Sequence, residues 1–145
     1  MKNYSDEQNV LIIVSLLKSY GIRKVIASPG TTNVALISSL QADSYFQMYS
    51  AVDERGAAYM ACGLAAESNE PVVISCTGAT ASRNYLSGLT EAYYRKLPIL
   101  AITSTQPIRN VGHHVAQVID RSSIQKDVAR LSVNLPVVKD ENDFW

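Results

Sequence analysis

"PVVISCTGATASRNYLSGLTEAYYRKLPILAIT", residues 71–103, is the stretch of the sequence that decides the fold. Its two ends, residues 71–76 and 98–103, are apolar on both faces, which is typical of strands buried inside a parallel sheet. Between them, a turn of small and polar residues opens a helical stretch that reaches Arg95. The order strand, helix, strand predicts two parallel strands joined by a helix that covers the sheet.

The same alternation continues outward on both sides of this stretch. Further strands are predicted at residues 24–28, 45–51 and 134–138. Further helices are predicted from Ser5 to Tyr20, through Leu36, Ile37 and Leu40, from Asp53 to about Ser68, and near residues 120–131. For the first helix, Ser5 and Gln8 form a capping-box pattern and Gly21 marks the end. The sequence therefore predicts the α/β class, with an open, mostly parallel sheet and helices on both faces in three α/β/α layers.

Length and composition restrict the class of protein. The chain has 145 residues, of which 47% are hydrophobic, so one folded domain over residues 1–145 is expected rather than disorder. Thirteen basic residues balance thirteen acidic ones, and no charge excess points to nucleic acid or a membrane surface as a partner. The apolar run 10–17 is too short to span a bilayer. Cys62 and Cys76 fall in predicted regular structure, which favours a reduced, cytoplasmic setting over a disulfide framework.

Ligands of open parallel sheets bind at the carboxyl ends of the strands. In this sequence those ends are small and polar, as a site close to backbone requires. They are "SPGTT" (28–32), "AVDER" (51–55), "CTGAT" (76–80) and "TSTQP" (103–107).

Glu54 has an unusual helical phase. A stripe of small residues follows it at helical spacing: Ala57, Ala58, Ala61, Cys62 and Ala65. Asp53 is the natural N-cap, and an acid in the first turn is also explained by the helix dipole, worth roughly 0.3–1 kcal/mol. On this buried face, however, desolvation disfavours the carboxylate, whereas the helix N-terminus and Arg55 favour it. A carboxyl between these influences is suited to exchange a proton with a ligand.

These motifs resemble a known family. "DERGAAYMACGLA" (53–65) followed by residues 71–103 resembles the pyrimidine-binding, N-terminal domain of thiamine-diphosphate enzymes, in the group of acetohydroxyacid synthases and 2-oxoacid decarboxylases. "SPGTT", "DER", "CTGAT" with "RNY", and "QVID" bring the chain near the SEPHCHC synthases of the menaquinone pathway. The resemblance covers residues from about 5 to 138. The sequence lacks the GxGxxG and GxxxxGK[ST] motifs, which argues against the interpretation of this chain as an ordinary nucleotide-binding domain.

The resemblance implies a role for Glu54. The matching glutamate of the family hydrogen-bonds N1′ of the cofactor's aminopyrimidine, which lets the 4′-nitrogen take the proton from thiazolium C2. By the same resemblance, Thr77, Gly78 and Asn84 are expected to lie at the cofactor. A plain strand-to-helix turn explains Thr77 and Gly78 equally simply, and Asn84 is otherwise an ordinary solvated helix residue.

Further residues are expected on the substrate side. By resemblance they are Ser28, Gly30, Thr31 and Gln117, although a capping turn and a polar loop explain them as well. Thr32 and Gln106 occupy positions where the SEPHCHC synthases carry arginines, which puts isochorismate as acceptor in doubt.

His113 and His114 are the chain's two histidines and lie in a predicted loop. A His-His pair in a similar place of the pyruvate decarboxylase branch helps proton transfer, so the pair is a catalytic candidate. Two exposed loop histidines are the alternative.

The resemblance also implies a missing part. In this family another domain holds the diphosphate and Mg²⁺, and its Gly-Asp-Gly segment is absent here; no metal site is predicted in this chain. The chain, which stops after "VVKDENDFW", is thus expected to be a fragment or one subunit of a split enzyme, inactive alone and paired as a homodimer or higher. The predicted function is decarboxylation or carboligation of a small 2-oxo acid with thiamine diphosphate. A non-catalytic assembly domain and the alpha subunit of a sulfopyruvate-type decarboxylase remain alternatives.

Overall fold

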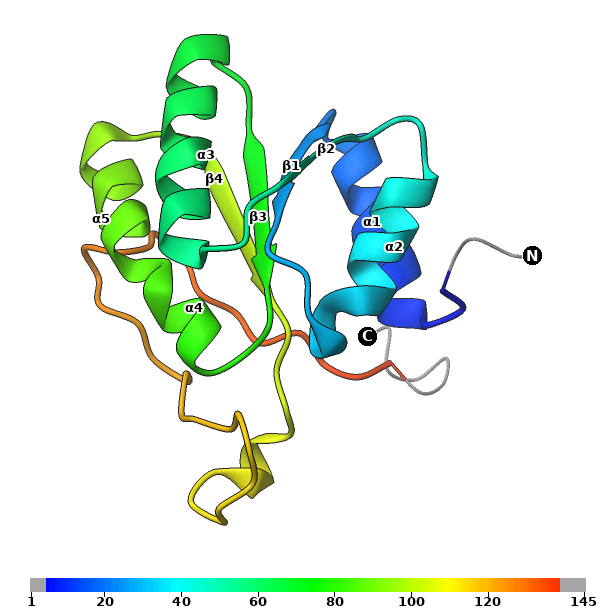
Figure 1. Ribbon diagram of the computed structural model, residues 1–145, viewed down its shortest axis with the longest axis vertical. Coiled ribbons are helices and arrows are strands. Elements are labelled where there is room, and N and C mark those ends of the chain that lie inside the picture. Colours follow the sequence, from blue (N-terminus) through cyan, green and yellow to red (C-terminus); the bar gives the residue numbers. More distant parts are fainter. Residues whose placement is uncertain (1–4, 139–145) are drawn as a thin grey trace.

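The structure is a computed structural model and describes residues 5–138 (Figure 1). Within that range one sheet of four strands forms the centre, in the spatial order β2-β1-β3-β4, and every neighbouring pair is parallel. The strands are β1 (Lys24–Ala27), β2 (Gln47–Ser50), β3 (Val72–Cys76) and β4 (Ile99–Thr103). The predicted parallel sheet is confirmed.

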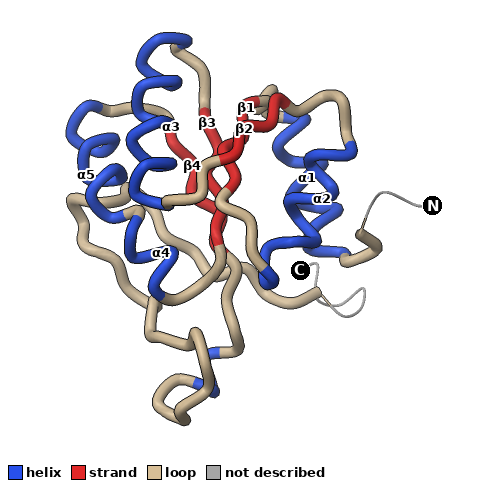
Figure 2. The backbone as a smooth tube through the Cα atoms, in the orientation of Figure 1, coloured by secondary structure: helices blue, strands red, loops and turns tan. Residues whose placement is uncertain are grey.

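Helices cover both faces of this sheet and produce the predicted three layers (Figures 1 and 2). The helices α1 (Gln8–Ser19) and α2 (Val34–Ala42) cover one face, and α3 (Glu54–Ser68) and α5 (Leu86–Arg95) cover the other. The short α4 (Thr80–Asn84) follows the carboxyl end of β3. Two 3₁₀ turns, η1 (Thr31–Asn33) and η2 (Ile108–Asn110), complete the regular structure.

Each face of the sheet has its own apolar core. Val25 and Val73 pack toward α1 and α2, whereas Ile26 and Ile74 pack toward α3 and α5. Successive side chains of a strand point to opposite faces, so a covered sheet requires the apolar runs that the sequence shows. All five residues of β3 are buried, as expected for a central strand. The sequence predicted that β4 is buried on both faces, and this overestimated its burial. β4 is an edge strand, and Leu100 is 42% exposed.

Two helix boundaries differ from the prediction. Ser5 does not cap α1; the N-cap is Glu7, whose N–H donates to the Ser5 hydroxyl at 3.1 Å. The helix predicted to run unbroken to Arg95 is interrupted at Tyr85, whose N–H donates to the Ser82 carbonyl in a tighter turn. Gly21 ends the first helix as predicted, with a φ of +70°.

Residues 120–138 contradict two predictions, since they form neither the helix near 120–131 nor the strand 134–138. Side-chain hydrogen bonds replace the helical ones at the start of this segment: the Asp120 carboxylate accepts from Ser122 N, and Arg83 donates to the Asp120 carbonyl. Further on, Asn9 Nδ2 donates to the Pro136 carbonyl, and Asn9 Oδ1 accepts from the Val138 N–H. This segment is therefore held by a side chain and not by the backbone of a neighbouring strand.

Two further expectations concern membrane-spanning segments and the C-terminal residues of the chain. In the part that the structure describes, no helix has the length and apolar character needed to cross a membrane. Residues 139–145 of "VVKDENDFW" lie outside the described range, so the structure does not bear on that expectation.

Candidate functional site

Glu54 is the first residue of α3, at the carboxyl edge of the sheet. The helix starts there because Asp53 caps it: its backbone is extended, and its Oδ2 accepts a hydrogen bond from Gly56 N at 2.7 Å. This confirms the predicted cap. The next turn of α3 carries Ala57 and Ala58, which are fully buried, so the helical phase places Glu54 at the edge of a buried face.

The stripe of small residues packs against α5 of the same chain. Gly88 lies so close to α3 that a Cβ built on it would be 2.4 Å from the Cβ of Ala58. The Cys62 thiol also donates to the Gly88 carbonyl, at 3.3 Å. The close contact of this stripe is therefore made within the chain.

The Glu54 carboxyl is half-buried and makes no hydrogen bond or ion pair with any residue in the described range. Its charge acts on two buried groups. Burial is the main cause that raises the pKa of the Cys76 thiol, to about 11, and the charge of Glu54 raises it further. Burial likewise raises the pKa of the Tyr85 hydroxyl well above its usual value, with Cys76 and Glu54 adding to the shift. The charge of Glu54 is therefore felt at the end of β3, where the Thr77–Gly78 turn begins.

Two buried hydroxyls lie under this edge without a hydrogen bond of good geometry in the described part of the chain, although they are close enough to interact with each other. They belong to Ser28, at the end of β1, and to Tyr85, between α4 and α5. Ser28 is 4% exposed and Tyr85 1% exposed. An unpaired buried hydroxyl costs about 1–3 kcal/mol, and such groups concentrate where a protein binds or reacts.

The turn after β1 packs directly on the turn after β3. A Cβ built on Gly30 would be 2.4 Å from Thr77 Cγ2, so only glycine permits this approach without a shift. Buried Asn33 fixes the first turn: its Oδ1 accepts from Gly30 N at 2.8 Å, and its Nδ2 donates to the Ser28 carbonyl and to Ser75 Oγ, each at 3.3 Å. Asn33 is a positioning residue that the sequence pattern did not single out.

The turn after β3 also contacts the segment that follows β4. A Cβ built on Gly78 would be 2.9 Å from the Ser104 carbonyl, 3.5 Å from Arg121 Nη2 and 3.7 Å from the Gln117 carbonyl. Ser28, Gly30, Thr77 and Gly78 therefore gather at one edge of the sheet, as the sequence predicted for strand ends, and the backbone of Gln117 lies beside Gly78. Their roles stay predictions.

Arg121 is the residue at this edge that the sequence analysis missed. It is half-buried and donates from Nη1 to Thr103 Oγ1 at 3.0 Å and from Nη2 to the Ser104 carbonyl at 2.7 Å. Burial lowers the pKa of its guanidinium, which remains a cation at neutral pH. The ion pairs of the described residues do not include it. The available signal was a basic residue directly after "QVID", in an otherwise small and polar loop.

The other candidate side chains are exposed. Asn84 is exposed and donates from Nδ2 to the Thr80 carbonyl at 3.2 Å, and Thr31 is exposed in η1. His113 and His114 are exposed on the loop after η2, which extends away from the sheet (Figure 1). The catalytic role of the histidine pair stays a prediction.

The residues fit one part of the expected cofactor. A half-buried carboxyl without a partner, next to turns made of glycine and small residues, suits the edge and face of an aminopyrimidine ring. Residues 5–138 offer no comparable site for the diphosphate and its cation. They contain no group of three or more His, Cys, Asp or Glu side chains able to hold a metal ion.

Comparisons with known proteins find relatives of this chain. A family model described as "Thiamine pyrophosphate enzyme, N-terminal TPP binding domain" matches residues 10–124. The 2-succinyl-5-enolpyruvyl-6-hydroxy-3-cyclohexene-1-carboxylate synthase of Bacteroides thetaiotaomicron is 35% identical over 142 residues, which are 98% of this chain and 26% of that protein. The synthase of the same name from Porphyromonas gingivalis is 38% identical over 117 residues, or 81% of this chain and 20% of the relative. The chain thus spans about a quarter of the length of the curated relatives it matches.

Solved structures share the fold. The thiamine diphosphate-dependent 4-hydroxybenzoylformate decarboxylase of Rhodococcus jostii superposes with a TM-score of 0.69 at 20% identity, over 78% of this chain and 21% of that one. The benzoylformate decarboxylase of Polynucleobacter necessarius gives 0.66 at 21% identity, over 75% and 20%. At this identity the likeness is one of fold.

Proposed function

The chain belongs to the family of thiamine pyrophosphate enzymes, as their N-terminal TPP binding domain, and from this premise we propose that it is the pyrimidine-binding part of an enzyme acting on a 2-oxo acid. The reaction is decarboxylation, carboligation to a second carbonyl compound, or both in sequence. Glu54 is the catalytic residue that this chain contributes.

The environment of the Glu54 carboxyl carries this proposal. The group is half-buried, has no partner among the described residues and lies beside Cys76 and Tyr85. A carboxyl whose oxygens are not used within the chain can hydrogen-bond to a ring nitrogen set against it and act there as a general acid or base. Thiamine diphosphate, when bound, supplies the electron sink for the loss of carbon dioxide. The chain orients the pyrimidine ring between its turns and holds the proton at the ring nitrogen.

The active site is shared with a diphosphate-binding domain or subunit, which holds Mg²⁺ as well. Support comes from the chain's length, about a quarter of that of its relatives, and from the lack of a cation cluster in residues 5–138. Assembly into a homodimer or a higher oligomer belongs to the same proposal. The partner is either the remainder of a longer polypeptide or a separate subunit, as in sulfopyruvate-type decarboxylases.

A non-catalytic assembly domain is the competing function. A domain kept only for assembly has no need of a half-buried acid without a partner among the described residues, beyond the modest stabilisation that an acid gives at a helix N-terminus. Glu54 is such an acid, and this favours the catalytic function.

Cofactor binding tests the shared site. We expect this chain alone to bind thiamine diphosphate weakly, and the complete enzyme with its diphosphate-binding domain to bind it tightly and only with Mg²⁺. Titration calorimetry of both, with thiamine lacking the diphosphate as the control ligand, measures the difference. Equal affinity of the isolated chain and the complete enzyme, or binding that ignores Mg²⁺, contradicts the shared site.

Arg121 is proposed to bind an anionic group of the substrate. Its guanidinium lies beside Gly78, in the turn expected at the cofactor. Within residues 5–138 only two of its donors are used, by Thr103 and Ser104. A partly buried guanidinium without a counter-charge is well suited to a carboxylate. It would supply the positive charge that Thr32 and Gln106 do not.

Replacing Arg121 with glutamine is expected to raise KM for the 2-oxo acid about 10- to 100-fold in the complete enzyme, because a charge-assisted hydrogen bond is lost. Steady-state kinetics measure the change, and Arg121→Lys is expected to recover part of it. Arg109→Gln, an exposed arginine of the same loop, serves as the control. If KM stays constant, Arg121 only fastens the loop to β4.

A further inference from the structure

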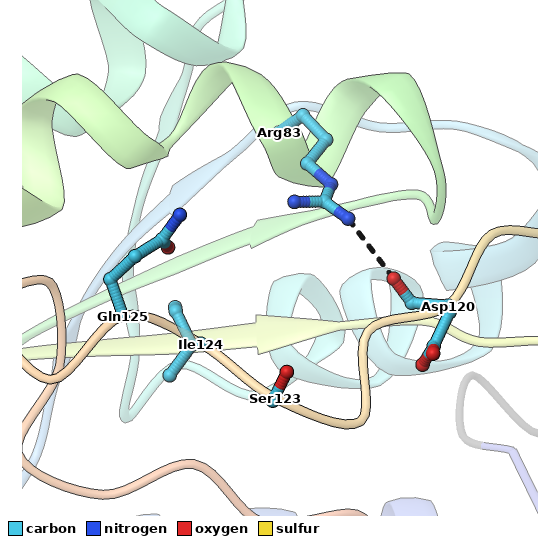
Figure 3. A pocket seen from close by; sticks show the side chains of 5 residues that line it. All are labelled: Arg83, Asp120, Ser123, Ile124 and Gln125. Carbon is cyan, nitrogen blue, oxygen red and sulfur yellow. Dashed lines mark hydrogen bonds between the residues drawn. The ribbon is translucent and has the colours of Figure 1, made fainter.

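An open concave site, most of whose lining residues are exposed, lies between α4 and the segment 120–125. Its volume is about 470 Å³, and it is lined by Arg83, Asp120, Ser123, Ile124 and Gln125 (Figure 3). Small-molecule sites commonly have volumes of about 300–1,000 Å³, so this one, called here the Arg83 cavity, is large enough for a small ligand. None of its lining residues belongs to the cluster at the carboxyl edge of the sheet.

Hydrogen-bond donors face the Arg83 cavity from both of its walls. In Figure 3 the guanidinium of Arg83 reaches down from α4, while the side chains of Ser123 and Gln125 rise from the opposite segment. Asp120 turns its backbone carbonyl to Arg83, with 3.0 Å between that oxygen and Nη2. Its carboxylate points away and accepts from Ser122 N at 2.8 Å instead. The cavity therefore presents a cation and two neutral polar groups, with the nearest acid turned aside.

The positive charge at this place is not neutralised by a salt bridge. The ion pairs of the described residues are Lys18–Asp43, Lys24–Glu70 and Arg95–Glu91, and none of them involves Arg83 or Arg121. The two arginines are near one another, because Arg83 binds the carbonyl of the residue that precedes Arg121. Burial lowers the pKa of Arg121, and the like charge of Arg83 lowers it further. An anion in the cavity would relieve this repulsion.

We propose that the Arg83 cavity binds the oxyanion of a small organic molecule, a carboxylate or a phosphate group, whose apolar part contacts Ile124. A guanidinium matches both oxyanions through paired, charge-assisted hydrogen bonds. Ser123 and Gln125 orient the same group from the other wall. The proposed function assigns no role to any residue that lines the cavity, so either assignment can fail without the other.

Two probes test the site: sodium benzoate, which combines a carboxylate with an apolar ring, and inorganic phosphate, which has no apolar part. Each is titrated into the purified chain at constant ionic strength, and the amide NMR shifts of residues 120–125 are followed. Saturable shifts are expected. Arg83→Gln should weaken binding at least about 10-fold, as expected for loss of a charge-assisted hydrogen bond. Saturation by benzoate alone assigns a carboxylate with an apolar body, and saturation by phosphate alone assigns a phosphate group.

Arg130→Gln is the matched control, because Arg130 is an exposed arginine on the same segment and does not line the cavity. It should leave the affinity unchanged, and both variants should keep the dispersed spectrum of a folded chain. The proposal is overturned if neither probe gives saturable shifts at residues 120–125. It is overturned equally if Arg130→Gln weakens binding as much as Arg83→Gln, because the effect would then be one of overall charge.

Discussion

Replacing Glu54 with glutamine is expected to slow the exchange of the C2 proton of bound thiamine diphosphate by about 100- to 10,000-fold, the range typical of a lost general acid or base. Glutamine has nearly the same shape and still reaches the ring nitrogen, but it cannot pass a proton to it. The carboxyl has no partner in the described part of the chain, so the substitution breaks no internal hydrogen bond. The fold and the cofactor affinity should therefore change little. Exchange of C2 hydrogen for deuterium, followed by NMR in the complete enzyme, measures the effect.

Glu67→Gln provides the matched control, because Glu67 is an exposed glutamate of the same helix. It should leave the exchange rate unchanged. If Glu54→Gln exchanges C2 hydrogen at the wild-type rate with the cofactor fully bound, the proposed role of Glu54 is wrong. Lost exchange together with lost cofactor binding would instead assign Glu54 to affinity, and titration calorimetry separates the two cases.

The part of the fold that the sequence predicted well is the part with local patterns. β1 and β3 were recognisable because both faces of a covered parallel strand are apolar. α3 was recognisable because a capping residue, Asp53, is followed by small residues at helical spacing. The segment after β4 was predicted wrongly because distant contacts decide it. Arg83 binds the Asp120 carbonyl across 37 positions of sequence, and Asn9 binds Pro136 across 127. The periodicity of a short stretch of sequence cannot reveal contacts over such distances along the chain.

The candidate site divides in the same way. Glu54 follows from helical phase and Asp53 from cap chemistry, so both are readable in a window of a few residues. Asn33 and Arg121 are not, because their positions depend on partners in other strands: Asn33 reaches Ser75 across 42 positions, and Arg121 reaches Ser104 across 17. A sequence shows which strand ends are polar. Which side chains meet there is settled by how the turns pack on one another.

Gly88→Ala is expected to destabilise the domain by about 1–3 kcal/mol, the usual cost of overpacking a close-packed interface. The added Cβ would be 2.4 Å from the Cβ of Ala58, and 3.0 Å from its carbonyl carbon. That carbon is backbone of α3 and cannot rotate away, so α3 and α5 must separate. The separation also stretches the hydrogen bond from the Cys62 thiol to the Gly88 carbonyl. Urea denaturation of the chain, compared with the wild type, measures the loss.

Gly63→Ala separates this packing cost from the intrinsic effect of removing a glycine from a helix. Gly63 lies in the same α3 with nothing within 4 Å of the position of an added Cβ, and it is exposed. Alanine there should stabilise the domain by about 0.5–1 kcal/mol, because it has the higher helix propensity. The two Gly→Ala substitutions must therefore shift the urea midpoint in opposite directions. Shifts of the same sign would mean that α3 and α5 are not in close contact at Gly88, and the small-residue stripe that begins after Glu54 would then be free to pack against another chain.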